Sequence, residues 1–359
     1  MDKLKKLQNF WKNKNVFITG HTGFKGTWFT IFLNLLGANV YGYSLKAKKK
    51  SLFNIIDNKI ILKNSKIGDV RDYKSLKKSI LISKPDIIFH FAAQALVNNS
   101  YQNPKETFET NIIGLLNLLN IIKNGYAIRS MLILTTDKVY KDSKKKIYKE
   151  ADELGGNDPY SASKVCKEII TQSYIKSFFE KSNLKNRISV ARSGNVIGTG
   201  DFSDDRLIPD MMKSYLKNKK LIIRNPEHIR PWQHVIEPLY GYLLLAEKQY
   251  EGNINSKGYS WNFGPEKNNF LKVKKVLNHF EKVTKNKLKV KYTNKIHVKE
   301  SNSLKLNNNK SKKYLNWIPK WDVEKTLKKT IELEKLLTKK KNINNLFKEQ
   351  IIDYLNNRG

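Results

Sequence analysis

The chain has 359 residues, of which 68 are Lys or Arg and 32 are Asp or Glu, so its formal net charge is +36. Hydrophobic residues make up 40% of it, which is enough to bury a core and argues against a disordered chain. The single cysteine, Cys166, excludes an internal disulfide framework. No apolar run approaches the ~18–20 residues needed to cross a bilayer, and the first residues hold no apolar signal-peptide core. We therefore expect a cytoplasmic protein without membrane contact.

The positive charge suggests a nucleic-acid partner, but the pattern of the cations argues against one. Only eight of the cations are arginines, and the lysines are scattered along the whole chain. No basic recognition helix and no stacking motif accompanies them. We expect no nucleic-acid partner, and charge alone does not indicate the function.

In chain order, the first 190 residues alternate short β-type runs with helical patterns, which indicates a parallel sheet with crossover helices. The runs that predict strands are 16–19, 39–43, 87–89, 131–135 and 188–191. The segments with apolar residues at helical spacing are 28–36, 73–82, 106–122, 161–179, 270–283 and 323–337. The sequence therefore predicts an α/β fold, a Rossmann-type doubly wound parallel sheet with a smaller C-terminal domain. The expected dinucleotide-binding domain is 1–190, and 191–359 is mainly for substrate, with later segments free to return to the sheet.

A glycine-rich loop follows the first predicted strand. Gly20, Gly23 and Gly26 stand at three-residue spacing before a helix expected to begin near Thr27. Gly20 would allow a tight turn, Gly23 the close approach of a pyrophosphate, and Gly26 the packing of helix on strand. The N–H groups of the helix N-terminus would then bind phosphate oxygens. The loop predicts a dinucleotide site, although an ordinary glycine turn can have the same spacing.

The adenosine end of that site is less defined by the residues. The second predicted strand ends without the carboxylate that would bind the adenosine ribose, and Lys46 nearby would suit a 2′-phosphate. These residues therefore leave NAD and NADP open. Asp69 and Val70 would place a carboxylate and an apolar contact around the adenine, or Asp69 could be a turn residue.

A candidate catalytic pair lies on the helix predicted near 161–179. Tyr160 and Lys164 are four residues apart, which puts both on one helix face. A nearby ammonium stabilises phenolate, so Tyr160 can act as a general base below its usual pKa near 10. Lys164 can also donate to the hydroxyls of a nicotinamide ribose. Thr136, at the end of a strand, supplies a third group, and Asp137 and Lys138 follow it directly.

Together these motifs resemble the extended short-chain dehydrogenase/reductase superfamily, and within it the nucleotide-sugar 4,6-dehydratases. In that superfamily the dehydrogenases need only the hydroxyl at Thr136, whereas the dehydratases add two acid/base groups where Asp137 and Lys138 stand. The segments 90–94 and 110–111 resemble the superfamily's loop beneath the nicotinamide and the helix asparagine that organises its site. The segments 153–160, 191–198, 205–210 and 230–235 resemble the dehydratases that act on CDP-glucose. The resemblance is dense over about residues 16–265 and thinner beyond.

The resemblance implies a nucleotide-sugar substrate, CDP-glucose, together with bound NAD, no metal, and a homodimer formed through a helical face. The implied cofactor contacts, beside the three loop glycines, are Thr22, Phe24, Asp69, Val70, Ala92, Ala93, Gln94, Asn111, Tyr160 and Lys164. The implied substrate contacts are Asn195, Arg206, Arg230, Trp232 and His234. Of these, Arg206 and Arg230 suit a diphosphate because a guanidinium is a planar fork. Trp232 could stack on the base or pack the domain seam, and a structural role for His234, or for Arg192 beside the site, is as open as substrate contact.

The family's reaction also implies roles. Tyr160 would remove the proton of the sugar 4-hydroxyl as hydride leaves C4, the new ketone would acidify C5, water would leave, and hydride would return to C6. We expect Asp137 to protonate the departing 6-hydroxyl. Lys138 stands where relatives have glutamate, and a protonated lysine cannot remove a proton. Burial near Lys164 could make it neutral, or it could act as an acid or stabilise an enolate while Asp137 moves the proton.

Two other functions stay open. One is a different nucleotide-sugar enzyme of the same fold, either another 4,6-dehydratase or a 4-epimerase. An epimerase needs no acid/base pair, so Asp137 and Lys138 argue against it. The other is a non-catalytic dinucleotide-sensing protein, which would have no need to keep Thr136, Tyr160 and Lys164 together.

Overall fold

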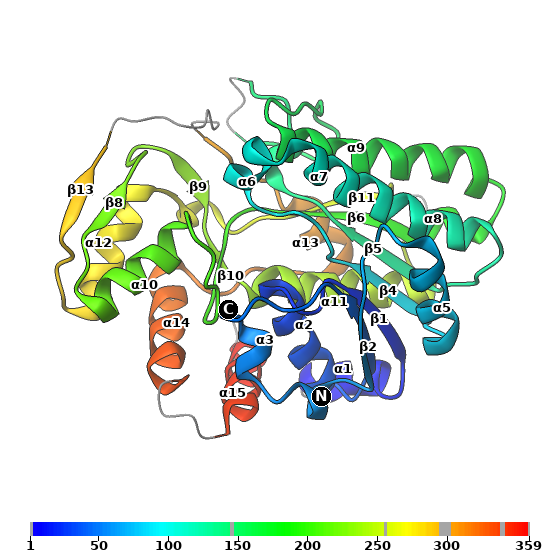
Figure 1. Ribbon diagram of the computed structural model, residues 1–359, viewed down its shortest axis with the longest axis horizontal. Helices are drawn as coiled ribbons and strands as arrows, with labels where there is room; N and C mark the ends of the chain where they lie inside the picture. The colour runs from blue at the N-terminus through cyan, green and yellow to red at the C-terminus, as the bar shows by residue number, and fades with distance from the viewer. Residues whose placement is uncertain (1–2, 144–146, 255–256, 294–302, 338–341, 358–359) are drawn as a thin grey trace.

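The computed structural model describes residues 3–143, 147–254, 257–293, 303–337 and 342–357. Its centre is a seven-stranded sheet, parallel throughout, with the strand order β11-β6-β5-β4-β1-β2-β3 (Figure 1). The strands are β1 (Asn15–Thr19), β2 (Asn39–Ser44), β3 (Asn64–Ile67), β4 (Ile87–His90), β5 (Ser130–Leu134), β6 (Ile188–Ser193) and β11 (Ser260–Phe263). The chain crosses from β3 on one side of β1 to β4 on the other, which is the doubly wound order. In such sheets ligands bind outside the carboxyl ends of the strands at this crossing.

Alternating apolar side chains give the sheet two buried faces. In β1, Val16 and Ile18 join one apolar cluster and Phe17 joins the other. Helices on the first face are α1 (Lys3–Trp11), α2 (Phe24–Leu35), α11 (Ile236–Glu251), α13 (Asn309–Leu315) and α15 (Ile343–Asn356). The second face carries α5 (Tyr73–Ser83), α8 (Gly114–Lys123) and α9 (Pro159–Tyr174). The result is a three-layer sandwich, on the right in Figure 1.

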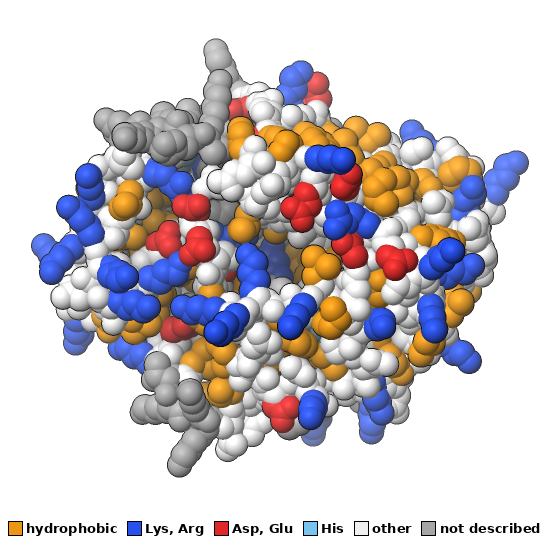
Figure 2. Space-filling view, viewed as in Figure 1, with side chains coloured by type: hydrophobic (Ala, Val, Ile, Leu, Met, Phe, Trp, Pro, Cys, Tyr) orange, Lys and Arg blue, Asp and Glu red, His pale blue; other side chains and the backbone are white. Residues whose placement is uncertain are grey.

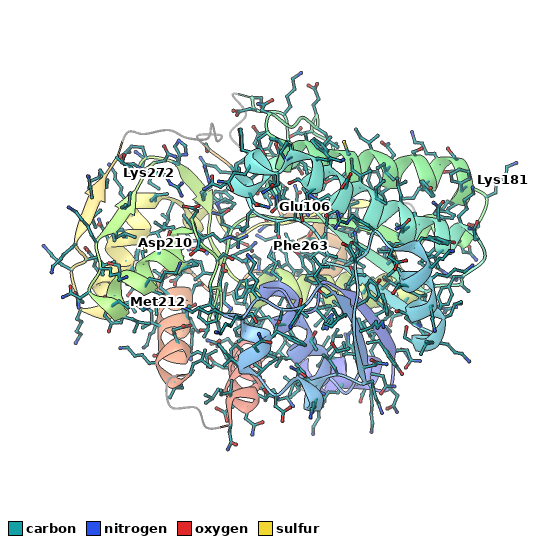
Figure 3. All side chains as sticks on the ribbon, in the orientation of Figure 1. Glu106, Lys181, Asp210, Met212, Phe263 and Lys272 are labelled. Carbon is teal, nitrogen blue, oxygen red and sulfur yellow. The ribbon has the colours of Figure 1, made fainter. Side chains whose placement is uncertain are left out.

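A smaller unit lies to the left of the sheet in Figure 1. Its helices are α10 (Leu207–Lys217), α12 (Val273–Thr284) and α14 (Val323–Leu337), which pack around a third apolar cluster that includes Met211, Phe280 and Leu327. Its strand pairs are β7 (Val196–Ile197) with β10 (Gln233–His234), β8 (Leu221–Ile223) with β13 (Val290–Tyr292), and β9 (Ile229–Pro231) with β12 (Phe270–Lys272). In Figure 3, Asp210 and Met212 of α10 lie in this unit, and Phe263 of β11 lies in the sheet.

The short helices of the fold connect these parts. They are α3 (Leu52–Ile55), α4 (Asn58–Ile61), α6 (Val97–Gln102) and α7 (Pro104–Phe108). A π-helical turn, Glu109–Ile113, joins α7 to α8, and such turns are frequent at functional sites.

The five predicted strands are confirmed as β1, β2, β4, β5 and β6. The helix expected near Thr27 begins three residues earlier at Phe24, because the glycine loop closes directly into it. The helix predicted over 270–283 is wrong at its start, where 270–272 pairs antiparallel with β9 instead. The sequence did not predict β3, whose four residues are all exposed and so lack apolar alternation.

The seventh strand comes from the later part of the chain. β11 pairs parallel with β6, and α11, α13 and α15, which lie beyond residue 190, also pack against the sheet. The boundary predicted at 190/191 falls inside β6. Residues on both sides of the predicted boundary therefore contribute to the sheet that was expected to bind the dinucleotide.

Candidate active site

The glycine loop is fixed by contacts that leave no room for side chains. Gly20 has φ +79°, and a methyl group there would lie 2.7 Å from the backbone nitrogen of Ala92. A methyl group at Gly26 would lie 2.2 Å from the carbonyl oxygen of Gly20. Gly23 precedes α2, whose first N–H groups have no partner within the helix. The loop thus presents helix N–H donors over bare backbone, which fits the pyrophosphate of a dinucleotide.

The other two predicted loop residues tie the loop to its surroundings. The Thr22 hydroxyl donates to the carbonyl oxygen of Leu45 at 3.0 Å and lies 2.8 Å from the Ser44 hydroxyl. Phe24 packs beside Gly198, where an added methyl group would lie 3.2 Å from the end of its ring. Thr22 therefore joins the loop to the end of β2, and Phe24 joins it to the strand after β6.

Asp69 and Val70 are both engaged by protein groups. The Asp69 carboxylate accepts from the backbone N–H of Arg71 at 2.9 Å and from its guanidinium at 2.6 Å, and these hydrogen bonds lower the pKa of Asp69. Val70 is buried, and a methyl group on Gly114 would come within 2.6 Å of it. The predicted adenine contacts of Asp69 and Val70 remain predictions.

Asn111 holds the loop that follows β4. Its side-chain oxygen accepts from the N–H of Gln94 at 2.9 Å, and its amide donates to the Gln94 carbonyl at 3.2 Å and to the Ser163 hydroxyl at 2.8 Å. Ser163 in turn donates to the carbonyl oxygen of Tyr160 at 2.7 Å. The loop of Ala92, Ala93 and Gln94 is therefore connected to the Tyr160 turn of α9 through one fully buried side chain.

Thr136, Tyr160 and Lys164 meet at the carboxyl end of β5, and each side chain is at least nine-tenths buried. The Lys164 ammonium lies 5.7 Å from the centroid of the Tyr160 ring. Burial raises the pKa of Tyr160, while the charge of Lys138 and a hydrogen bond with Thr136 act to lower it. Burial lowers the pKa of Lys164 to about 7, and the charge of Lys25 contributes in the same direction. Helical spacing places Tyr160 and Lys164 on one face of α9, and the packing of α9 beside the end of β5 brings Thr136 to them.

Asp137 and Lys138 lie in the same group. The Asp137 carboxylate is buried, accepts from the Thr136 hydroxyl at 3.0 Å and lies 3.6 Å from the Lys138 ammonium. Its second oxygen has no hydrogen-bond partner among the described residues. A buried carboxylate oxygen without a donor is costly, so this oxygen is a candidate for a hydrogen bond with a bound ligand.

Lys25 is a site residue that the sequence analysis missed. It stands inside the glycine loop, and its ammonium donates to the Ser193 hydroxyl at 2.9 Å. Burial lowers the pKa of Lys25 to about 8, with the charge of Arg206 acting in the same direction and that of Asp137 opposing it. A lysine in the first turn of a helix whose sequence is otherwise mostly apolar was the available signal.

Arg192 forms an interior ion pair rather than a substrate contact. Its guanidinium donates to both carboxylate oxygens of Glu168, the shortest contact being from its terminal nitrogen, and to the Tyr140 hydroxyl at 2.8 Å. Thr135, one residue before Thr136, donates to the same carboxylate at 2.8 Å. The pair joins the catalytic helix to β5 and β6.

The two predicted phosphate ligands, Arg206 and Arg230, belong to the smaller unit. Arg206 is the N-cap residue of α10, and its guanidinium lies 3.2 Å from the carboxylate of Asp201. Its positive charge acts to lower the pKa values of Lys25 and Tyr160. Arg230, on β9, is buried and lies 3.1 Å from a ring nitrogen of His228. Asn195 is half-buried between β6 and β7. Figure 2 shows a hollow near the middle of this face, with Lys and Arg side chains in and around it.

Trp232 and His234 are enclosed by protein. The Trp232 indole donates to the carbonyl oxygen of Leu271 at 3.0 Å within the third apolar cluster. The His234 ring packs edge-on against Trp28 and Trp321, and burial lowers its pKa to about 3. Of the alternatives left open by the sequence, the geometry favours packing for both residues.

Two searches of the described residues bear on other classes of function. In that part of the chain no group of three or more His, Cys, Asp or Glu side chains is arranged to hold a metal ion. None of its helices is both long and apolar enough to cross a membrane.

Comparison with known proteins gives a consistent result. The family profile described as GDP-mannose 4,6 dehydratase matches residues 17–330. The chain is 40% identical, over 97% of its length and 98% of the relative's, to the CDP-glucose 4,6-dehydratase of Salmonella typhimurium. An epimerase structure from Methanothermobacter thermautotrophicus matches with a TM-score of 0.79 at 22% identity, covering 94% of this chain and 97% of that one. The NAD complex of the Bacillus anthracis dTDP-glucose 4,6-dehydratase matches with a TM-score of 0.72 at 22% identity, covering 89% and 96%. At these identities the two structures establish the shared fold.

Proposed function

The chain belongs to the GDP-mannose 4,6-dehydratase family, and we propose that it is an NAD-dependent nucleotide-sugar 4,6-dehydratase that acts on CDP-glucose. The proposal rests on the observation that two groups of residues meet at the carboxyl end of β5. Thr136, Tyr160 and Lys164 make a dehydrogenase site, and Asp137 and Lys138 add an acid/base pair at the same strand end. The product would be CDP-4-keto-6-deoxyglucose, with water released and no net oxidation.

The cofactor site consists of the glycine loop, the loop after β4 and the Tyr160 turn. Gly20 and Gly26 leave backbone exposed to the pyrophosphate, and Asn111 fixes the distance between Gln94 and α9. Lys164 would donate to the nicotinamide ribose. NAD, when bound, supplies the hydride acceptor of the first step and the hydride donor of the last.

Tyr160 would accept the proton of the sugar 4-hydroxyl as the hydride leaves C4. A hydrogen bond with Thr136 acts to lower the pKa of the Tyr160 phenol and so favours the phenolate, and the Thr136 hydroxyl also lies 3.0 Å from the Asp137 carboxylate. Positive charge from Lys138 and Arg206 favours the phenolate and opposes the effect of burial. The ketone formed at C4 then makes the C5 hydrogen acidic.

The elimination uses Asp137 and Lys138. The unpaired Asp137 oxygen is suited to hold the proton that the 6-hydroxyl needs in order to leave as water. If Lys138 is neutral, it would remove the C5 proton and give it back to C5 as hydride returns to C6, and the O4 proton held by Tyr160 would replace the one that Asp137 gave to the leaving water. If Lys138 is charged, it would stabilise the enolate while Asp137 carries the C5 proton to the 6-hydroxyl, and the O4 proton held by Tyr160 would protonate C5.

CDP-glucose is the proposed substrate because the relative with 40% identity over nearly the whole chain is named for it, whereas a dTDP-glucose 4,6-dehydratase from Dictyostelium discoideum is 28% identical over 74% of this chain. We also propose a cytoplasmic homodimer. Nucleotide sugars and NAD are cytoplasmic metabolites, and exposed apolar side chains lie on α9 (Ile169), in the π-helical turn before α8 (Ile113) and in the π-helical turn after α9 (Phe178). Figure 2 shows hydrophobic side chains gathered at the upper right, where α8 and α9 lie in Figure 1.

The test is incubation of the purified protein with CDP-, dTDP-, UDP- and GDP-glucose. We expect a 4-keto-6-deoxy product from CDP-glucose, without accumulation of NADH. Tyr160→Phe should lose this activity, whereas Tyr292→Phe, at an exposed tyrosine of β13, should keep it. A 4-epimer as the product, or turnover of dTDP-glucose alone, would overturn the proposal.

A further inference from the structure

Three polar side chains from separate parts of the fold meet beside the active site. The Asp205 carboxylate accepts from the Asn98 amide at 2.7 Å and from the Arg224 guanidinium at 3.3 Å. Asn98 lies on α6 of the sheet unit, Arg224 follows β8 of the smaller unit, and Asp205 immediately precedes Arg206. The hydrogen bond between Asn98 and Asp205 therefore joins the two units across the substrate side of the fold.

Stability gives little reason for this arrangement. The Asp205 and Arg224 side chains are 56% and 35% exposed, and an ion pair with that exposure contributes little to folding. Asp205 also has φ +60°, a left-handed conformation that few residues other than glycine adopt. A backbone held in a rare conformation with its carboxylate still half open to solvent is a common feature of binding sites.

The pair lies next to a cation that acts on the candidate catalytic group. The charge of Arg206 acts to lower the pKa of Tyr160, and its guanidinium suits a diphosphate. Asp205 is the residue immediately before Arg206, and Arg224 pairs with Asp205. A nucleotide sugar with its sugar at Tyr160 and its diphosphate at Arg206 would have its base within reach of this pair.

Resting on the proposed function, we propose that Asp205 and Arg224 recognise the nucleobase and select cytosine. Cytosine presents an amino donor at C4 beside acceptors at N3 and O2. A carboxylate beside a guanidinium is complementary to that edge, since Asp205 accepts from the amino group and Arg224 donates to the ring acceptors. Uracil and thymine carry a carbonyl oxygen at C4, which would face the carboxylate without a hydrogen atom between them. Asn98 is a positioning residue, because its amide orients the carboxylate.

The decisive variant is Asp205→Asn. An asparagine amide can donate to the C4 carbonyl of uracil as well as accept from cytosine, so the preference for cytosine should fall. We expect the ratio of kcat/KM for CDP-glucose over UDP-glucose to drop by roughly 5- to 100-fold, the range for one base-specific contact. The matched control is Asp204→Asn, since Asp204 is the exposed neighbour whose carboxylate pairs with Lys213 instead. It makes the same change of charge and should leave the ratio as in wild type.

Equilibrium binding of CDP and UDP to the full-length protein, measured by calorimetry, gives the same ratio without any chemistry. It therefore separates the two proposals: a protein that prefers CDP but produces no 4-keto sugar contradicts the proposed function and supports base selection. A wild type that turns over CDP-glucose, with an Asp205→Asn variant of unchanged nucleotide preference, overturns base selection alone. Equal changes in Asp205→Asn and Asp204→Asn also overturn it, because net charge would then account for the effect. Arg224→Gln should weaken CDP binding by a similar factor, and a wild-type affinity for CDP in that variant is a third contrary result.

Discussion

The buried ion pair of Arg192 and Glu168 gives the sharpest prediction of stability. Both side chains are at most 1% exposed, and the Glu168 carboxylate has Thr135 as its only other hydrogen-bond donor among the described residues. Arg192→Met would leave the carboxylate buried with one neutral donor. Removal of one member of such a pair costs about 3–5 kcal/mol, because the desolvation of the remaining charge is no longer offset. With an m value of about 3 kcal/mol/M, the urea midpoint should fall by roughly 1–2 M.

The double variant Arg192→Met with Glu168→Gln distinguishes a charge effect from lost packing. It removes both charges and keeps an acceptor for Thr135, so we expect it to recover at least half of the loss. Lys213→Met is the control at an exposed ion pair and should change the midpoint little. Circular dichroism in urea measures all three variants. A loss of under about 1 kcal/mol for Arg192→Met, or a double variant as unstable as the single one, would refute the reasoning.

Three further variants test other parts of the structure. Burial raises the pKa of Glu237 to about 7, above the ~4.3 of an unfolded carboxyl. Wild type should therefore lose up to about 3 kcal/mol of stability as the pH rises from about 5 to 8. The urea midpoint of Glu237→Gln should depend less on pH than that of wild type. Asp137→Asn should slow product formation by ~10²–10⁴-fold while reduced nicotinamide accumulates on addition of CDP-glucose, and stopped-flow absorbance that shows no reduction would contradict a role confined to elimination. Gly26→Ala places a methyl group 2.2 Å from the Gly20 carbonyl oxygen and should weaken NAD binding at least ~10-fold in a fluorescence titration, since overpacking here displaces the phosphate loop.

The parts of the site that depend on local spacing could be predicted from the sequence. Gly20, Gly23 and Gly26 follow one another at three-residue spacing where the loop enters α2, and Tyr160 and Lys164 are one helical turn apart. Backbone geometry alone then places them relative to each other. Thr136 was predictable because it directly follows the apolar run 131–135, which the sequence predicts as a strand and which the structure confirms as β5.

The missed parts depend on contacts between distant segments. Lys25 meets Ser193 across 168 positions, and Asn98 meets Asp205 across 107. No periodicity in the chain encodes such contacts. The first arises from the packing of α2 beside the end of β6, and the second from how the loop before α10 docks on the sheet unit. The strand β12 was missed for a related reason. Its three residues continue the apolar pattern of α12, and only their antiparallel pairing with β9 makes them a strand.

The excess positive charge of the chain bears on ligand binding specifically only where several cations lie in the same buried region. Lys25 experiences Arg206 and Lys138 as like charges and Asp137 and Asp201 as opposite ones. With Lys164 also present, this region holds more cations than carboxylates, and the lowered pKa values of Lys25 and Lys164 show that burial and repulsion oppose their full protonation. A diphosphate brings about two negative charges to the same region and would relieve that repulsion. Relief of this repulsion in the free protein would thus contribute to the affinity for a nucleotide sugar. The remaining lysines are spread over the surface and add only a salt-sensitive attraction.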